Sequence, residues 1–225
     1  MTTILVTGAS RGIGAHTARH LASTGATVYA GARRPEEVEG AGDLRPLALD
    51  VTDDASVAAA VERVSSESGV LDVLVNNAGV PGSWGGPAEI GPADFHDVFE
   101  VNVVAPARTT RAFLPLLRRS RSPRLVMVSS GMGSLALQSG DPTYAEIAHL
   151  PYPASKAALN MLVVQYAKAL PEVLVTAVDP GLTATEFTGG SGHSVAEGAE
   201  AVITAALDTT GPSGRFMDRN GPTPW

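Results

Sequence analysis

Tyr152 and Lys156 lie four residues apart in the run Tyr-Pro-Ala-Ser-Lys. If this run is helical, the two side chains share one face, because residues four apart are neighbours on a helix. A phenol with an ordinary pKa of about 10 is a poor acid or base at neutral pH. A neighbouring ammonium favours the phenolate and moves that pKa towards the working pH. The spacing therefore predicts a proton-transfer pair.

A glycine pattern near the start of the chain adds a second chemical feature. Gly8, Gly12 and Gly14 follow the apolar run Ile4–Thr7 and open the amphipathic segment Ile13–Thr24. Glycine lets a backbone turn tightly and approach a pyrophosphate, whose charge is stabilised by the free N–H groups at a helix start. A tight strand-to-helix turn without a ligand is the alternative. Together with Tyr152 and Lys156, the glycine pattern predicts a nicotinamide dinucleotide site and hydride transfer to a carbonyl.

The residues after the second expected strand bear on cofactor choice. A protein that binds NAD places a carboxylate there, about 20 residues past the glycines, to bind the ribose hydroxyls. Here Ala32 is followed by Arg33 and Arg34, and Arg11 lies inside the glycine turn. Guanidinium groups suit a 2′-phosphate through charge and bidentate contact. The pattern favours NADP(H), with ordinary solvated loop charges as the alternative.

Three further polar residues stand where chemistry is expected. Ser129 and Ser130 end the fifth expected strand, where a hydroxyl could hydrogen-bond a substrate carbonyl or simply cap the strand. Asn102 lies in the long apolar stretch Val98–Ala107, and an unpaired buried amide costs about 1–3 kcal/mol. Asn102 is therefore expected to bind either the backbone or a structural water, or a water of a proton relay.

Short apolar runs alternate with longer amphipathic segments along the whole chain. The expected strands are Ile4–Thr7, Thr27–Gly31, Leu44–Leu49, Val70–Asn76, Arg124–Ser129, Leu174–Val178 and Gly214–Met217. The expected helices are Ile13–Thr24, Ala55–Ser68, Ala93–Arg119, Ala154–Leu170 and Val195–Asp208. Strands that are apolar on both faces and joined by helices imply a parallel sheet covered on both sides.

The order predicts an α/β protein: a single-domain Rossmann fold over residues 1–225, with a doubly wound parallel sheet of about seven strands. Its ligand crevice should lie at the carboxyl ends of the strands. The irregular segments Val80–Glu89, Gly131–Pro151 and Glu186–Ser194 follow strands, so we expect them on the ligand side.

The composition argues against several other classes of protein. The 16 basic and 23 acidic residues give a net charge of −7, which disfavours nucleic acid or an anionic membrane as the main partner. The chain has no cysteine, and its five histidines show no metal-binding pattern, so no metal site is expected. No basic leader precedes Ile4, and no apolar run has the roughly 18 residues of a membrane span. A cytoplasmic protein is the simplest expectation.

These features, taken together, resemble the short-chain dehydrogenase/reductase family in its single-domain branch. Besides the glycine pattern, Asn102, Ser130 and the Tyr152–Lys156 pair, the matching motifs are Asp50-Val51, Asn76-Asn77-Ala78-Gly79 and Pro180-Gly181-x-x-x-Thr185. Within the family, Ala32-Arg33 and the tail Gly211–Arg219 look most like the carbonyl reductase and menthone reductase group.

The resemblance implies a role for each matching residue. Ser130 would polarise the carbonyl, Tyr152 would donate or remove the proton, and Asn102 would anchor a relay water. Lys156 would lower the pKa of Tyr152 and hold the nicotinamide ribose. Asp50 and Val51 would flank the adenine, and Asn76 to Gly79 would line the adenosine ribose and the strand end. Pro180 to Thr185 would hold the carboxamide side of the nicotinamide. The residues expected to bind the cofactor are Gly8, Ser10, Arg11, Gly12, Ile13, Gly14, Arg33, Arg34, Asp50, Val51, Asn76, Ala78, Gly79, Tyr152, Lys156, Pro180, Gly181, Leu182 and Thr185.

The expected function is an NADPH-dependent reductase of ketone, aldehyde or quinone carbonyls, or the reverse alcohol oxidation. A non-catalytic NADP(H)-binding redox sensor on the same fold is the main alternative. Such a sensor can lose the tyrosine or the lysine, and both are present here. An epimerase or dehydratase is a third alternative, disfavoured by the short Glu186–Ser194 segment and the single domain.

The ligand-side loops predict a small apolar carbonyl or alcohol as substrate. Their apolar side chains are Trp84, Met132, Leu135, Leu137, Leu150, Leu182 and Phe187, about half of which should pack under their own loops. The 21-residue insertion Gly131–Pro151, longer than in most of the family, leads into the Tyr152 helix. We expect it to cover the face on which most relatives form tetramers, and hence a monomer or homodimer.

Overall fold

The computed structural model describes residues 2–40 and 42–225, which form one eight-stranded sheet in the order β3-β2-β1-β4-β5-β6-β7-β8. The strands are β1 Thr3–Thr7, β2 Thr27–Ala32, β3 Leu44–Ala48, β4 Val73–Asn76, β5 Arg124–Val128, β6 Leu174–Val178, β7 Arg215–Asp218 and β8 Gly221–Pro222. The seven expected strands pair in parallel, as predicted. The sequence pattern missed β8, because a two-residue antiparallel strand has no periodicity to detect.

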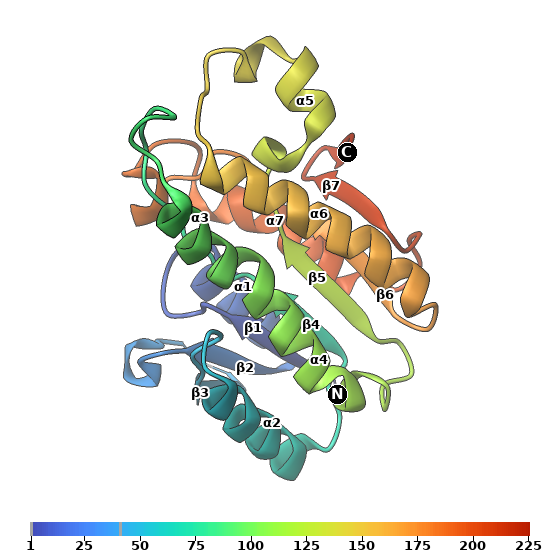
Figure 1. Ribbon diagram of the computed structural model, residues 1–225. Helices are drawn as coiled ribbons and strands as arrows, with labels where there is room; N and C mark the ends of the chain where they lie inside the picture. The colour runs from blue at the N-terminus through green and yellow to red at the C-terminus, as the bar shows by residue number, and fades with distance from the viewer. Residues whose placement is uncertain (1, 41) are drawn as a thin grey trace.

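Helices cover both faces of the sheet (Figure 1). They are α1 Gly12–Ser23, α2 Asp54–Ser68, α3 Pro92–Phe99, α4 Ala105–Leu117, α5 Leu135–Gly140, α6 Pro151–Ala169 and α7 Val195–Leu207. α2, α4 and α6 bury Val57, Phe113 and Leu159 in one apolar core, whereas α1 and α7 bury Leu21 and Val202 in the other. These two cores explain why the parallel strands are apolar on both faces.

The expected helix Ala93–Arg119 is three pieces in the structure. α3 and α4 are separated by a π-helical turn over Glu100–Val104, and α4 ends at Leu117. Asn102 lies in that turn and is fully buried. A π turn adds one residue to a helix and is common at functional sites. The apolar pattern continues through it, so sequence periodicity could not reveal the break.

The insertion Gly131–Pro151 is less irregular than expected. It contains a 3-10 turn at Gly131–Gly133, the helix α5, and a second 3-10 turn at Pro142–Tyr144. Ser134 fixes α5 to the chain terminus, because its hydroxyl accepts from the Leu137 amide at 3.1 Å and donates to the Pro224 carbonyl at 2.7 Å.

The insertion does not cover the face where it was expected. Figure 1 shows α5 above α6 in this view, with the sides of α4 and α6 that face the viewer left uncovered. Val104, at the end of the π turn, and Met161, in α6, are 43% and 57% exposed. The expected monomer or homodimer therefore stays a prediction.

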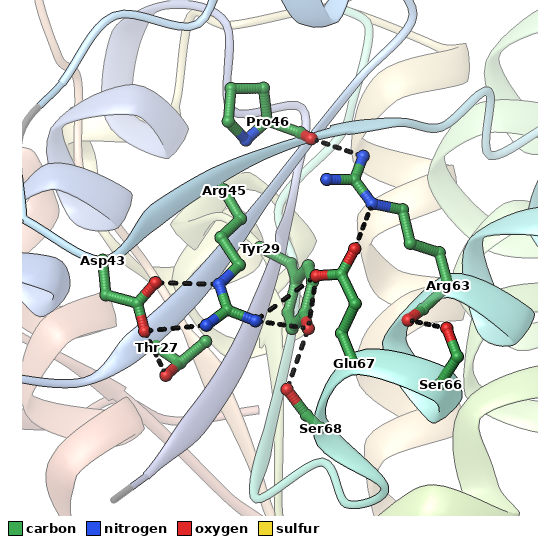
Figure 2. A network of polar contacts seen from close by, with 9 residues as sticks. All are labelled: Thr27, Tyr29, Asp43, Arg45, Pro46, Arg63, Ser66, Glu67 and Ser68. Carbon is green, nitrogen blue, oxygen red and sulfur yellow. Dashed lines mark hydrogen bonds and ion pairs between the residues drawn. The ribbon is translucent and has the colours of Figure 1, made fainter.

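A polar network ties the edge strand β3 to α2 (Figure 2). Arg45 donates to Asp43 at 2.8 Å, to the Tyr29 hydroxyl at 3.1 Å and to Glu67 at 3.3 Å. Arg63 closes the network by pairing with Glu67 at 2.8 Å. Because the network lies at the amino ends of β2 and β3, away from the predicted ligand edge, its role is structural.

No helix in the described part of the chain has the length and apolar character needed to cross a membrane.

Candidate active site

The glycine turn after β1 is held against the end of β4 so closely that side chains are excluded. Gly8 has a φ of +66°, and a Cβ there would lie 2.9 Å from the Ala78 Cα. A Cβ on Gly14 would lie 2.4 Å from both the Gly8 oxygen and the Asn77 Nδ2. The first and third glycines are therefore required by packing and by backbone conformation.

The start of α1 is suited to an anion. Its N-cap residue, Arg11, makes no side-chain cap, and the first turn carries no acidic residue. The first N–H groups of a helix lack partners within the helix and carry its partial positive charge. This end of α1 therefore fits the pyrophosphate of a dinucleotide.

The two asparagines after β4 have different tasks. Asn77 Nδ2 donates to the Thr7 carbonyl at 2.8 Å and to the Gly8 carbonyl at 3.2 Å, which fixes the glycine turn. Asn76 faces α4, accepting from Thr109 at 2.6 Å and donating to Thr110 at 3.2 Å. The Asn76 amide is thus occupied within the protein, and its expected contact with the ribose stays a prediction.

The three arginines of the expected phosphate site differ in their partners. Arg11 pairs with Glu186 at 2.5 Å, and Arg34 pairs with Glu37 at 2.8 Å. Within residues 2–40 and 42–225, Arg33 alone of the three has no carboxylate at ion-pair distance. Arg33 directly follows β2 and is exposed. It is therefore the cation most available to a 2′-phosphate.

Asp50 and Val51 follow β3, at the same edge of the sheet as Arg33, which follows β2. The Asp50 carboxylate accepts from the Thr52 amide at 2.9 Å and from its hydroxyl at 2.7 Å. These two hydrogen bonds, and to a smaller extent the charge of Arg33, hold the pKa of Asp50 below its usual value. Asp50 is therefore ionised and fixed close to the predicted adenine-ribose end of the site.

Tyr152 and Lys156 lie in the first turns of α6 and are both buried, at 9% and 4% exposure. Lys156 Nζ donates to the Val128 carbonyl at 2.8 Å and lies 5.6 Å from the centre of the Tyr152 ring. A Cβ on Gly133 would lie 2.6 Å from the Lys156 carbonyl carbon, so the loop after β5 packs directly on α6. The expected pair is thus held at the crevice by β5 and its loop.

The two serines after β5 have different roles: one is structural, and the other belongs to the candidate site. Ser129 donates to the Asn160 Oδ1 at 2.6 Å and is buried beneath α6. Ser130 accepts from the Met132 amide at 3.2 Å, and its hydroxyl also hydrogen-bonds the Tyr152 phenol. Ser130 therefore joins Tyr152 and Lys156, whereas Ser129 does not.

Burial governs the protonation of this group. It raises the pKa of Tyr152, and the hydrogen bond from Ser130 only partly opposes this. Burial also lowers the pKa of Lys156 to about 8, with the Asp179 carboxylate acting in the opposite direction. The expected lowering of the Tyr152 pKa is not seen in the protein alone, because desolvation, together with the Asp179 carboxylate, outweighs the Ser130 hydrogen bond. Tyr152 is therefore a neutral phenol.

Asn102 links the π turn to its surroundings. Its Oδ1 accepts from the Val80 amide at 2.9 Å, while its Nδ2 donates to the Val80 carbonyl at 2.9 Å and to the Ser155 hydroxyl at 3.0 Å. The amide thus anchors the segment after β4 beside α6. Its expected role in holding a relay water stays a prediction.

The loop after β6 supplies the remaining expected cofactor residues. Gly181 has a φ of +69° and Leu182 is exposed, while Thr185 precedes a 3-10 turn at Glu186–Thr188. Thr188 donates to the Thr183 carbonyl at 2.5 Å, so this short loop is held by its own hydrogen bonds. It presents Phe187 to the Tyr152 ring, with the ring centres 5.5 Å apart.

Sequence reasoning missed Asp179, although an acid directly after β6, beside Pro180, was visible. Its carboxylate accepts from the Gly181 amide at 2.9 Å and faces the Gly131 amide. It therefore links the loop of Ser130 to the loop expected at the nicotinamide. Burial raises the pKa of Asp179 above its usual value.

His149 was also missed as a site residue. It packs against Tyr152 in the structure, and only its position three residues before the tyrosine could have suggested this. Of the expected apolar side chains, Trp84 and Phe187 reach this group, whereas Leu135 and Leu137 lie on α5.

A hollow of the surface lies next to this site and contains none of its reacting side chains. This hollow, of about 450 Å³, lies beside the segment 80–83, lined among others by Thr52, Asp97 and Val101, and it excludes Tyr152. Across the described residues, no three His, Asp or Glu side chains gather closely enough to hold a metal ion.

Known proteins resemble this chain over most of its length. A family model described as short chain dehydrogenase matches residues 2–195. The chain is 38% identical over 224 residues to the short-chain dehydrogenase anuI of Penicillium roqueforti, covering 91% of this chain and 88% of that protein.

Solved structures show the same relationship. An NADPH-bound carbonyl reductase from chicken fatty liver superposes with a TM-score of 0.86 at 27% identity, covering 100% of this chain and 99% of that one. Salutaridine reductase from Papaver somniferum gives a TM-score of 0.82 at 26% identity, with 97% and 99% covered. The chain therefore belongs to the short-chain dehydrogenase/reductase family, whose members are oxidoreductases that use NAD(P)(H).

Proposed function

We propose that this enzyme is an NADPH-dependent reductase of ketone, aldehyde or quinone carbonyls, or catalyses the reverse alcohol oxidation. One observation carries the proposal. The buried neutral phenol of Tyr152 lies beside Ser130 and Lys156, on the same sheet edge as the glycine turn. We further propose that residues 1–225 form one catalytic domain.

Each of these side chains has a distinct task in the proposed reaction. A nicotinamide dinucleotide held at the glycine turn would supply the hydride for the carbonyl carbon. The Ser130 hydroxyl orients the carbonyl, and the Tyr152 O–H donates its proton to the carbonyl oxygen, which yields the alcohol. The Lys156 ammonium stabilises the phenolate left on Tyr152. In the reverse direction the phenolate removes the proton from the alcohol.

The choice of NADP(H) rests on the end of β2. Ala32 supplies no carboxylate that would repel a 2′-phosphate, and Arg33 is exposed there without an ion-pair partner in the described part of the chain. The Arg11–Glu186 pair is 68% and 74% exposed, so it contributes at most about 1 kcal/mol and can be exchanged for a phosphate contact.

The substrate proposal rests on the apolar side chains of the loops that follow β4 and β6. Trp84, Leu182 and Phe187 are exposed at 64%, 62% and 40%, which suits a small apolar carbonyl or alcohol. The net charge of −7 disfavours nucleic acid and membrane surfaces as partners. A cytoplasmic monomer or homodimer completes the proposal, and light scattering after size exclusion tests its assembly.

Carbonyl reduction should be constant below pH 7 and fall as the pH rises through about 8. The pKa of Lys156 is lowered to about 8, so above that pH the neutral amine no longer stabilises the phenolate of Tyr152. A pH profile of kcat measures this. In Lys156→Arg the charge does not titrate in this range, so the fall should move to higher pH. An identical fall in both proteins would contradict the assignment.

A screen of NADPH oxidation against ketones, aldehydes and quinones tests the proposed function. We expect turnover of apolar carbonyls in preference to hydroxy acids or phosphorylated substrates. Tight binding of NADPH without turnover of any carbonyl would instead favour a redox sensor. Faster turnover of the charged substrates would contradict the apolar site.

A further inference from the structure

His149 lies beside the catalytic tyrosine but has no task in the reaction described above. Its side chain is 5% exposed, and its ring centre is 5.9 Å from that of Tyr152, with the planes 15° apart. The imidazole also stacks on Trp84, with ring centres 4.0 Å apart. His149 is therefore part of the wall next to the reacting hydroxyl.

The hydrogen bonding of His149 fixes which ring nitrogen carries the proton. Its Nε2 lies 3.1 Å from the Ser83 carbonyl oxygen, which can only accept, so Nε2 is the donor. Burial lowers the pKa of His149, and the ring is neutral. A neutral imidazole that donates through Nε2 has a free lone pair on Nδ1. Nδ1 is therefore a hydrogen-bond acceptor.

That acceptor has no partner within residues 2–40 and 42–225, although Nδ1 is buried. Most buried polar side-chain atoms are hydrogen-bonded, and an unpaired one is costly. Nδ1 and Nε2 lie on different edges of the ring, so the Ser83 carbonyl cannot serve both. The geometry thus requires a donor that the described residues do not supply.

The side chains around His149 indicate the shape of the molecule that would carry this donor. Trp84 lies flat against the imidazole and is 64% exposed, so a ligand can displace it. The Phe187 ring contacts the Tyr152 ring edge-on, at an interplanar angle of 63°. Aromatic residues make up only 5% of the chain, and three of them gather here. Such walls favour a flat aromatic ligand.

We propose that His149 Nδ1 accepts a hydrogen bond from a hydroxyl group of the substrate and thereby selects hydroxyaryl ketones and aldehydes. The proposal rests on the proposed function, because Tyr152 must hold the carbonyl of the same molecule. His149 contacts the substrate away from the reacting atoms, so it determines specificity. A site that bonds a hydroxyl discriminates strongly against an analogue without that donor.

Paired substrates test this directly: the 3- and 4-hydroxyacetophenones and their O-methyl ethers. The enzyme should favour at least one hydroxy compound over its ether by about tenfold in kcat/KM, the size of one hydrogen bond. His149→Phe keeps a flat ring, and His149→Gln keeps a donor for the Ser83 carbonyl, but neither has an acceptor at the ring position of Nδ1. Both variants should lose the preference through a higher KM for the hydroxy compound.

The exposed histidine of α3 gives a matched control. His96→Phe should keep the preference unchanged, because the His96 side chain is exposed on α3 and is not among the rings that contact Tyr152. If the His149 variants lose kcat/KM equally for the hydroxy compound and for its ether, His149 has a merely structural role. Absence of any preference in the unmodified enzyme would also overturn the proposal.

Binding separates this inference from the proposed function. The chain has two tryptophans, so Trp225→Phe leaves Trp84 as the only one, and its fluorescence reports ligands at the site. The complex with NADP⁺ should bind the hydroxy compound more tightly than the ether, and His149→Gln should abolish that difference. If this difference in affinity is found but no carbonyl is turned over, the specificity role of His149 stands and the proposed reductase activity is rejected. No quenching, or equal affinities, would reject the inference.

Discussion

Replacing Tyr152 with phenylalanine is expected to abolish turnover while leaving NADPH binding nearly unchanged. The change removes the hydroxyl that transfers the proton and keeps the buried ring that packs on His149 and Phe187. General acid catalysis is worth about 10²–10⁴ in rate, and its loss should appear in kcat. Steady-state kinetics and a fluorescence titration of NADPH measure the two quantities separately.

Tyr144 provides the matched control for that experiment. It also comes close to the site, because a Cβ on Gly131 would meet its hydroxyl, but position 148 is Ala148 and supplies no ammonium. Burial raises the pKa of Tyr144, so it too is a neutral phenol. Tyr144→Phe should retain activity. An inactive Tyr144→Phe beside an active Tyr152→Phe would show that the site is misassigned.

Replacing Arg33 with alanine should weaken the binding of NADPH and leave the binding of NADH nearly unaffected. The loss of one charge-assisted contact with a 2′-phosphate costs about 1.5–3 kcal/mol, which is about 10- to 100-fold in KM. The KM of the variant for each cofactor, measured with one substrate, gives the result.

Arg34 is the natural comparison, because it already pairs with Glu37 at 2.8 Å. We expect Arg34→Ala to change the KM for NADPH much less than Arg33→Ala does. If Arg33→Ala raises the KM for NADPH and NADH equally, the guanidinium does not recognise the phosphate, and the preference for NADP(H) is wrong.

The sequence by itself determined the sheet and the residues that could do chemistry. Strands such as Val73–Asn76 are apolar on both faces, and this pattern requires helices on each side of a parallel sheet. The glycine turn and the Tyr152–Lys156 pair were also readable, because tight turns and helical spacing are local properties. The seven parallel strands and the family follow from such local patterns.

Only the tertiary structure decided how those residues are used. The π turn at Asn102 interrupts no apolar pattern, and the two-residue strand β8 exists only because β7 offers it a partner. Ser130 and Ser129 are equivalent in the sequence, yet packing under α6 commits Ser129 to Asn160.

Long-range contacts likewise decided the protonation and partners of the site residues. Burial, and not the spacing of Tyr152 and Lys156, raises the pKa of the phenol. Arg11 meets Glu186 and His149 meets Trp84 across loops distant in the chain. Desolvation and contacts between distant segments depend on the folded arrangement of the whole chain, and no local pattern encodes them.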